Sequence, residues 1–155
     1  MSDCCGARHR IVDHARQPID LRAALDFVKH DDFGGYDVFI GRVRQHNQGR
    51  QVTGISYDIF DALASYHLGD IIAAIREQIE PRMKVYLAHA KGRLQVGDIA
   101  VVVAVGTPHR DEAFRACRQL IERVKHEVPI WKQEHYVDGD SAWSDGCSLC
   151  DTQHP

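Results

Sequence analysis

The sequence lacks a long apolar run and a net positive charge. No segment of its 155 residues approaches the roughly 20 consecutive apolar residues that span a bilayer. The start, MSDCCGARHR, has no apolar core of a signal peptide. The formal charge is −3 at pH 7, which argues against a generic binder of nucleic acids or anionic membranes, because such proteins depend on a large positive field. We therefore expect a cytoplasmic protein in which any cationic site is local.

The sequence also has too few cysteines, in the wrong pattern, for a disulfide framework. Five cysteines are an odd number in a chain that is not small, so we expect them to be mainly reduced. Cys147 and Cys150 form a C-x-x-C, and Cys4 and Cys5 are adjacent. If the termini meet, these four thiolates could bind zinc and staple a non-catalytic interaction module. The alternatives are a redox pair in the C-x-x-C and a tail without a dedicated metal site.

The order of the predicted elements is that of one α+β domain with antiparallel hairpins, and the hydrophobic content of 44% is enough for one core. We assign 10–143 to this domain, 1–9 to a flexible N-terminal tail and 144–155 to a flexible, cysteine-containing C-terminal tail. The predicted strands are 10–14, 36–44, 51–60, 84–92, 99–106 and 130–137. The predicted helices are 21–29, with Asp20 as its N-cap, 62–79, with Asp61 as its N-cap, and 108–127.

Two pairing expectations follow from this pattern. The strands 36–44 and 51–60 are predicted to form a hairpin through the turn 45–49. The segment 99–106 is nearly all apolar and is therefore predicted to be a central strand covered on both faces.

Two lysines flank an apolar insert in KHEVPIWKQE, residues 125–134. On an ideal helix Lys125 falls about 20° from Phe114, at the edge of the apolar face of helix 108–127, and Lys132 lies beyond the proline. A partly desolvated lysine beside a second cation suits a nucleophile or a proton-transfer group. The alternative is a pair of lysines whose stems cover apolar surface while their ammonium groups stay in water.

A second cationic cluster lies in GTPHRDEAF, residues 106–114. Thr107 is a typical helix N-cap, which places His109 and Arg110 in the first turn. Free backbone N–H groups together with these two side chains would bind a phosphate or a carboxylate. The alternative is a surface turn in which the acidic pair that follows neutralises the two cations.

The third cluster is GRVRQHNQG, residues 41–49, in which Arg42 and Arg44 would share one face of a strand. Two guanidinium groups on one face could hold a phosphate through paired hydrogen bonds; the alternative is the exposed face of an antiparallel sheet. The three clusters lie at the ends of regular elements in an otherwise acidic chain. Together they indicate a small, anionic, phosphorylated substrate.

Four stretches resemble the catalytic (large) subunit family of molybdopterin synthase: FIGRVRQHNQG, HAKGRLQVGDIAVVVAV, PHRDEAF and LIERVKHEVPIWKQE. The resemblance covers 10–143 and implies an α/β hammerhead-like fold with an antiparallel sheet and an additional small α+β subdomain. It implies a sulfurtransferase that forms the dithiolene of molybdopterin from cyclic pyranopterin monophosphate. The sulfur would arrive as a thiocarboxylate on the C-terminal Gly-Gly of a small ubiquitin-like sulfur-carrier subunit, and the step would require no metal or other cofactor.

The resemblance also implies an assembly and a set of site residues. The assembly is a homodimer of large subunits within a heterotetramer, in which adjoining large subunits share an active site. By position, Lys125 matches the lysine that is essential for catalysis and Lys132 the second active-site lysine. The implied substrate-binding residues are Arg42, Val43, Arg44, His109, Arg110, Gln133 and Glu134.

Overall fold

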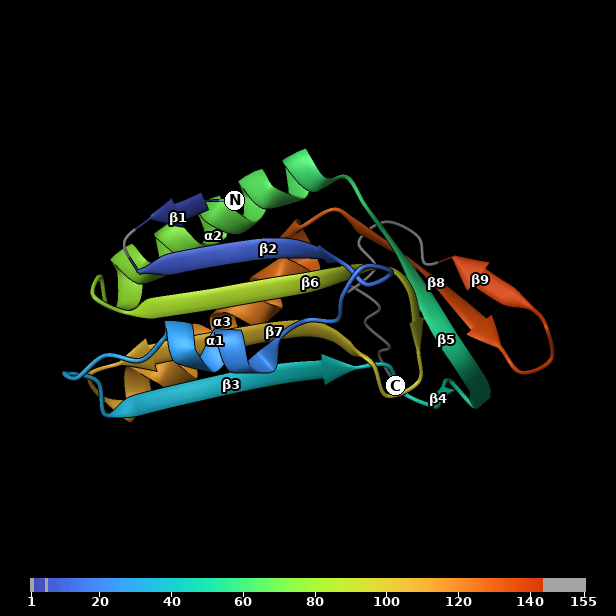
Figure 1. Cartoon of the computed structure of the whole chain (residues 1–155), viewed down its shortest axis with the longest axis horizontal. Helices are drawn as coiled ribbons and strands as arrows, with labels where there is room; N and C mark the ends of the chain where they lie inside the picture. Colours follow the sequence, from blue (N-terminus) through green and yellow to red (C-terminus); the bar gives the residue numbers. More distant parts are fainter. Residues whose placement is uncertain (1, 5, 144–155) are drawn as a thin grey trace.

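The computed structural model describes residues 2–4 and 6–143. It shows a sheet of nine strands with helices on both faces (Figure 1). The helices are α1 (Leu21–Phe27), α2 (Asp61–Ile79) and α3 (Arg110–Glu127). The strands are β1 (Ser2–Cys4), β2 (Ala7–Asp13), β3 (Gly35–Arg42), β4 (His46–Asn47), β5 (Arg50–Ile59), β6 (Lys84–Gln95), β7 (Ile99–Thr107), β8 (Ile130–Tyr136) and β9 (Ser141–Trp143).

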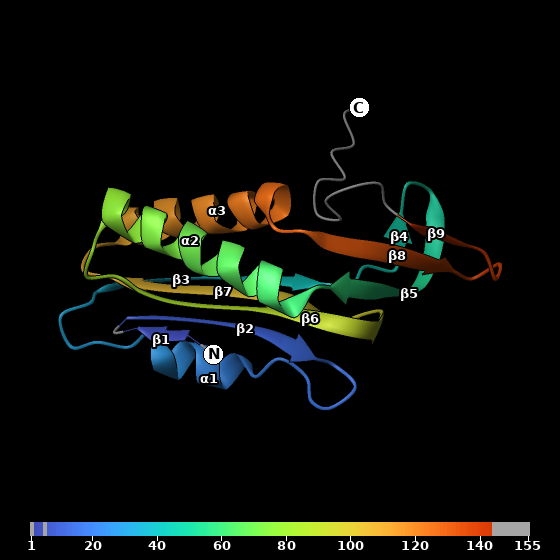
Figure 2. The same ribbon diagram turned by 90° about the horizontal axis from the view of Figure 1, so that it is seen from above.

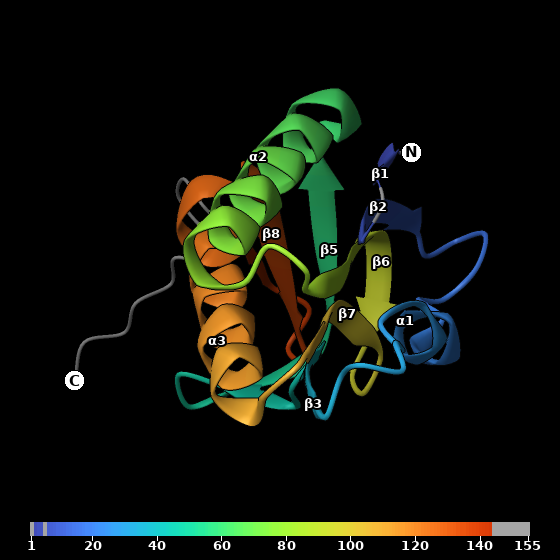
Figure 3. The same ribbon diagram turned by 90° about the vertical axis from the view of Figure 1, so that its left-hand side faces the viewer.

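The larger part of the sheet has the strand order β2-β6-β7-β3. The pair β2–β6 is parallel, whereas β6–β7 and β7–β3 are antiparallel. Helices α2 and α3 cover one face and α1 covers the other (Figures 2 and 3). The expected α+β class with an antiparallel sheet is therefore confirmed. No helix in the described part of the chain is long and apolar enough to cross a membrane.

Strand β7 is the central strand that the apolar segment predicted. Its residues from Ala100 to Thr107 are all buried, because α3 packs on one face and α1 on the other. A fully buried valine contributes about 1.5–3 kcal/mol relative to an exposed one. The run of valines in this strand is thus a main source of stability for the platform on which the site is built.

Strand β6 connects this larger part to a smaller part of the same nine-stranded sheet, called the second sheet below, and the sequence did not predict this connection. Its first part pairs with β2 and β7, and its last residues, Gly92 to Gln95, pair with β5. Gly92 has φ +96, a conformation in which a side chain would be strained. The strand bends there and continues beyond the predicted end of 84–92. The second sheet, which also contains β4, β8 and β9, lies at the right-hand end of Figure 1.

The predicted hairpin of 36–44 with 51–60 is wrong, because β3 pairs with β7 and β5 pairs with β6 and β8. The register shifts between Gly41 and Arg42, where a Cβ on Gly41 would lie 2.7 Å from Val101 Cγ1. The Val43 N–H then donates to the Asp98 carbonyl at 3.0 Å. These contacts end β3 and send the chain across to the second sheet.

The N-terminal strand starts earlier than predicted. Strand β2 begins at Ala7 rather than at Arg10, and β1 pairs with it in antiparallel fashion. Part of the segment that was expected to be a tail is thus hydrogen-bonded into the sheet. The expected C-terminal tail, 144–155, lies outside the described residues.

The three predicted N-caps have different outcomes. Asp20 is the N-cap of α1, where its carboxylate accepts from the Ala23 N–H at 3.1 Å, as predicted. Asp61 is instead the first residue of α2. Thr107 does not cap α3, because it is still the last residue of β7 and pairs with Gly35. The helix therefore starts later than predicted.

Candidate active site

The end of α3 and the start of β8 bring Lys125 and Lys132 to one hollow of about 400 Å³. Helix α3 ends where Val128 takes an extended conformation with its N–H bonded to the Val124 carbonyl, and Pro129 follows, which cannot continue a helix. Strand β8 begins directly afterwards. Both lysines thus line one hollow, and both side chains are half-buried.

The apolar face of α3 differs from the prediction at one position. Phe114 is 56% exposed, although it was placed on the buried face. The buried side chains of this helix are Ala113, Ala116, Cys117, Leu120, Ile121 and Val124. Lys125 follows the last of these and borders the core, so its half-buried position does not depend on a contact with Phe114.

The arginines of the third cluster reach the same hollow from the end of β3. Arg42 and Arg44 are exposed side chains that line it. Arg42 Nη1 donates to the Gly97 carbonyl at 2.7 Å, and Arg44 Nη2 donates to Asn47 Oδ1 at 3.4 Å. Val43 lies between them with 3% exposure and anchors the stretch to the core rather than lining the hollow.

Glu134 is a carboxylate buried on the inner wall of the hollow, with 7% exposure. It accepts from Asn47 Nδ2 at 2.6 Å and from the Tyr136 hydroxyl at 2.9 Å, and Lys132 Nζ lies 3.6 Å away. A buried carboxylate needs such partners, since burying an unpaired charge is costly. Burial, followed by the hydrogen bond to Glu134 and its charge, raises the pKa of Tyr136.

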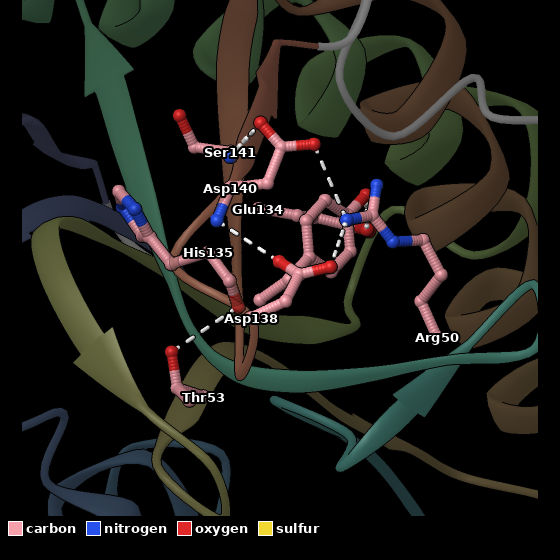
Figure 4. Close-up of polar contacts among 8 residues, drawn as sticks. Arg50, Thr53, Glu134, His135, Asp138, Asp140 and Ser141 are labelled. Carbon is pink, nitrogen blue, oxygen red and sulfur yellow. Dashed lines mark hydrogen bonds and ion pairs between the residues drawn. The ribbon is translucent and has the colours of Figure 1, made fainter.

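A cluster around Arg50, Asp138 and Asp140 holds the end of β8 (Figure 4). Arg50 Nη2 lies 2.9 Å from Asp138 Oδ2 and 3.3 Å from Asp140 Oδ2. The Arg50 guanidinium also lies over the Tyr136 ring, 3.6 Å from its centroid. The tyrosine whose hydroxyl donates to Glu134 is thus also held by a cation–π contact between its ring and Arg50.

Gln133 does not line the hollow with its neighbours. Adjacent residues of a strand point to opposite faces, so Gln133 points away from the face of β8 that carries Lys132 and Glu134. Its Nε2 donates to the Ser141 hydroxyl at 2.9 Å. The structure thus brings Glu134 to the predicted pocket but not Gln133.

His109 and Arg110 lie at the opposite end of α3 from Lys125. His109 is the N-cap of α3, and its backbone N–H donates to Glu112 Oε2 at 3.2 Å. The side chains of His109 and Arg110 are exposed. At ~1.5 Å of rise per residue, Arg110 lies about 22 Å from Lys125 along the helix axis. These two predicted anion binders therefore cannot reach the hollow of their own chain.

Two residues of the hollow were not predicted. Tyr57, which is 7% exposed, lines it from β5. In the sequence it shares the buried face of its strand with Ile55 and Ile59, so no signal singled it out as a site residue. Asn47 had been treated as part of a turn, and only its contact with Glu134 reveals its role in the site.

A second hollow, of about 690 Å³, lies along β2 and the start of α2. There Lys91 Nζ lies 2.8 Å from Asp61 Oδ2, and Arg16 Nε lies 3.7 Å from Asp13 Oδ2. Most of its cations are thus balanced by carboxylates. It is larger than the hollow of the lysine pair but less suited to an anion.

Among residues 2–4 and 6–143, no group of three or more His, Cys, Asp or Glu side chains is placed to hold a metal ion. Cys5, Cys147 and Cys150 lie outside the described residues, and of Cys4 only the backbone is described. The zinc-stapled module therefore stays an untested prediction. Cys117 is buried, as expected, and burial raises the pKa of its thiol to about 12.

Two lysines, two arginines and a buried glutamate around one hollow define an α+β protein with a site for an anionic ligand. The family model of the MoaE protein matches residues 14–127, and the chain belongs to this family. It is 44% identical over 143 residues to the molybdopterin synthase catalytic subunit of Synechococcus elongatus, covering 92% of this chain and 86% of the relative. The crystal structure of molybdopterin synthase from Staphylococcus aureus superposes with a TM-score of 0.79 and 34% identity, covering 87% of this chain and 94% of that one.

Proposed function

We propose that this chain is the catalytic subunit of a molybdopterin synthase that acts in the cytoplasm. It transfers sulfur from the C-terminal thiocarboxylate of a small sulfur-carrier subunit to cyclic pyranopterin monophosphate. The observation that carries this proposal is the convergence of Lys125, Lys132, Arg42 and Arg44 on one hollow. The catalytic-subunit relatives of the same family support it.

The arginines are placed to bind the phosphate of the pterin. Arg42 and Arg44 are exposed at the rim of the hollow, and guanidinium groups bind phosphate oxygens through paired, charge-assisted hydrogen bonds. The volume of about 400 Å³ is in the range of small-molecule sites. A phosphorylated pyranopterin and the narrow end of a glycine tail are of the size that such a space admits.

The lysines are placed to act on the acyl group. When the sulfur has bonded to the pterin, water adds to the acyl carbon, the carbon–sulfur bond breaks, and the carrier leaves as an ordinary carboxylate. The acyl oxygen carries negative charge during this addition, and a fixed ammonium group in a partly dry cavity stabilises that charge. Lys125 serves this role or moves the protons, and Lys132, held beside Glu134 at 3.6 Å, binds the substrate.

A second copy of the chain supplies His109 and Arg110 in this proposal. The two side chains are exposed at the start of α3, which is too far from the hollow of the same chain. A two-fold dimer repeats each contact with the roles of the copies exchanged. Each hollow would thus be completed by the α3 start of the adjoining copy.

The test is a reconstitution of the reaction. The chain is incubated with cyclic pyranopterin monophosphate and a thiocarboxylated carrier subunit, and the product is oxidised and measured by its fluorescence. We expect molybdopterin with the thiocarboxylated carrier and none with the same carrier ending in an ordinary carboxylate. Absence of product with a carrier that is active with another large subunit would refute the proposal.

A further inference from the structure

Tyr57 occupies a place in the hollow that none of the predicted residues fills. It lies on β5 directly opposite Lys132 of β8, so the two side chains leave the same face of the sheet next to each other. It lines the hollow and is 7% exposed. Its ring also makes an edge contact with His89, with the centroids 4.9 Å apart, which fixes its orientation.

The hydroxyl of Tyr57 has no hydrogen-bond partner among the residues that the structure describes. This is unusual, because a buried tyrosine hydroxyl normally finds one. The side-chain atoms that are both fully buried and without a partner in 6–143 are Arg10 Nε, His14 Nδ1 and His89 Nε2. The Tyr57 hydroxyl is not one of them, and Tyr57 lines the hollow, whereas the Tyr136 hydroxyl is already bonded to Glu134 at 2.9 Å.

The surroundings make this hydroxyl a donor and not a base. Burial, followed by the negative charge of Glu134, raises the pKa of Tyr57 to about 12. At neutral pH the group is therefore protonated and can give one hydrogen bond. A single neutral donor suits an acyl oxygen better than a phosphate, which the exposed arginines at the rim are better placed to neutralise.

We propose that the Tyr57 hydroxyl donates a hydrogen bond to the acyl oxygen of the carrier's terminal glycine and is a third catalytic group beside the two lysines. This inference rests on the proposed function. The donor is preorganised, because Tyr57 is fixed in β5 beside Lys132 of β8 and its ring contacts His89 before the ligand arrives. Such a donor lowers the barrier when negative charge develops on the oxygen that it faces.

The test compares Tyr57→Phe with the wild-type chain in single-turnover sulfur transfer. Phenylalanine keeps the ring and its contact with His89, so the fold is expected to be retained, with an unchanged thermal midpoint. We expect the rate to fall about 100-fold, while the affinity for cyclic pyranopterin monophosphate, measured by calorimetry, stays the same. A Tyr57→Phe chain with the wild-type rate would overturn the inference.

The matched control is Tyr86→Phe. Tyr86 is also buried, with 3% exposure, and makes no hydrogen bond in the described part of the chain, but it lies on β6 against Phe27 and does not line the hollow. The Tyr86→Phe chain should transfer sulfur at the wild-type rate. An inactive wild-type chain counts against the proposed function, whereas an active wild type with an equally active Tyr57→Phe counts against this inference alone.

A second measurement uses the wild-type chain and decides the matter if Tyr57→Phe does not fold. The five tyrosines are replaced by 3-fluorotyrosine, and the resonance of Tyr57 is assigned by elimination with variants of the other four. A peptide ending in Gly-Gly should shift this resonance. A resonance that stays in place at saturating peptide overturns the inference.

Discussion

The Lys132 ammonium lies 3.6 Å from the Glu134 carboxylate, and both side chains leave the same face of β8. Glu134 is in turn held by Asn47 and Tyr136. A cationic hollow thus contains one buried negative charge, which holds Lys132 in place and connects β8 with the segment that follows Arg44.

The first prediction concerns this carboxylate. Glu134→Ala should lower the free energy of unfolding by about 1–3 kcal/mol, because the Asn47 amide and the Tyr136 hydroxyl lose their buried acceptor. Urea denaturation measures the change. Glu77→Ala, an exposed position on α2, is the control and should be neutral. An equally small effect of both substitutions would show that the Glu134 contacts do not support the fold.

The second prediction concerns Lys125. Lys125→Ala should reduce product formation at least about 1000-fold, if this ammonium stabilises the acyl oxygen in the transition state, and should leave the circular dichroism spectrum unchanged. Lys29→Ala is the control, because the Lys29 side chain is exposed just after α1, where it pairs with Asp26. Normal turnover by the Lys125→Ala chain would remove this residue from the mechanism.

The third prediction concerns the rim of the hollow. Arg44→Ala should raise the KM for cyclic pyranopterin monophosphate about tenfold or more, since a charge-assisted phosphate contact is lost. Arg44→Lys should recover part of the affinity, because it restores the charge but not the paired geometry. Arg22→Ala, on the exposed side of α1, should have no effect. Equal KM values for the Arg44→Ala and wild-type chains would place the phosphate elsewhere.

The fourth prediction tests whether two copies share a site. Arg110→Ala and Lys125→Ala chains, each inactive alone, should regain about a quarter of the wild-type activity when mixed and allowed to exchange. Half of the dimers are then mixed, and each mixed dimer has one intact site. If the site lies within one chain, the mixture stays as inactive as its components.

The fifth prediction is a pH dependence of stability that arises from His89. Burial lowers the pKa of His89 to about 4 from its usual 6.5, so between these values the unfolded chain binds a proton that the folded chain does not. The stabilisation is fully present above pH ~6.5 and is lost as the pH falls towards ~4, by about 3 kcal/mol in total. The free energy of unfolding, measured by denaturation at several pH values, should fall over this pH range in the wild type and in the exposed control His46→Gln. It should fall less in His89→Gln.

Local chemistry explains why part of the site could be predicted from the sequence. A helix, a proline and a strand follow one another at 125–132, so the convergence of the two lysines depends on only a few consecutive residues. Arg42 and Arg44 are two positions apart and therefore share a side. In each case the residues are close in the sequence, so both members of each pair reach the same hollow even though β3 ends at Arg42.

The predictions fail where the position of a residue depends on distant parts of the chain, or on which face of a strand its side chain occupies. The pairing of β3 with β7 is decided by contacts such as Gly41 with Val101, which no local pattern contains. Gln133 was misplaced because it was grouped with Glu134 although adjacent strand residues point to opposite faces. Tyr57 was overlooked because a strand with one buried face does not distinguish a core residue from the floor of a cavity.

The length of α3 has a consequence for how this enzyme would respond to dilution. If His109 and Arg110 at one end of the helix complete the hollow of Lys125 in an adjoining copy, as proposed, an isolated chain contains two half-sites and no whole one. Under the proposed function, activity in sufficiently dilute solution falls with the square of the chain concentration. A cell that produces this subunit sparingly would then lose catalysis well before it loses the folded protein.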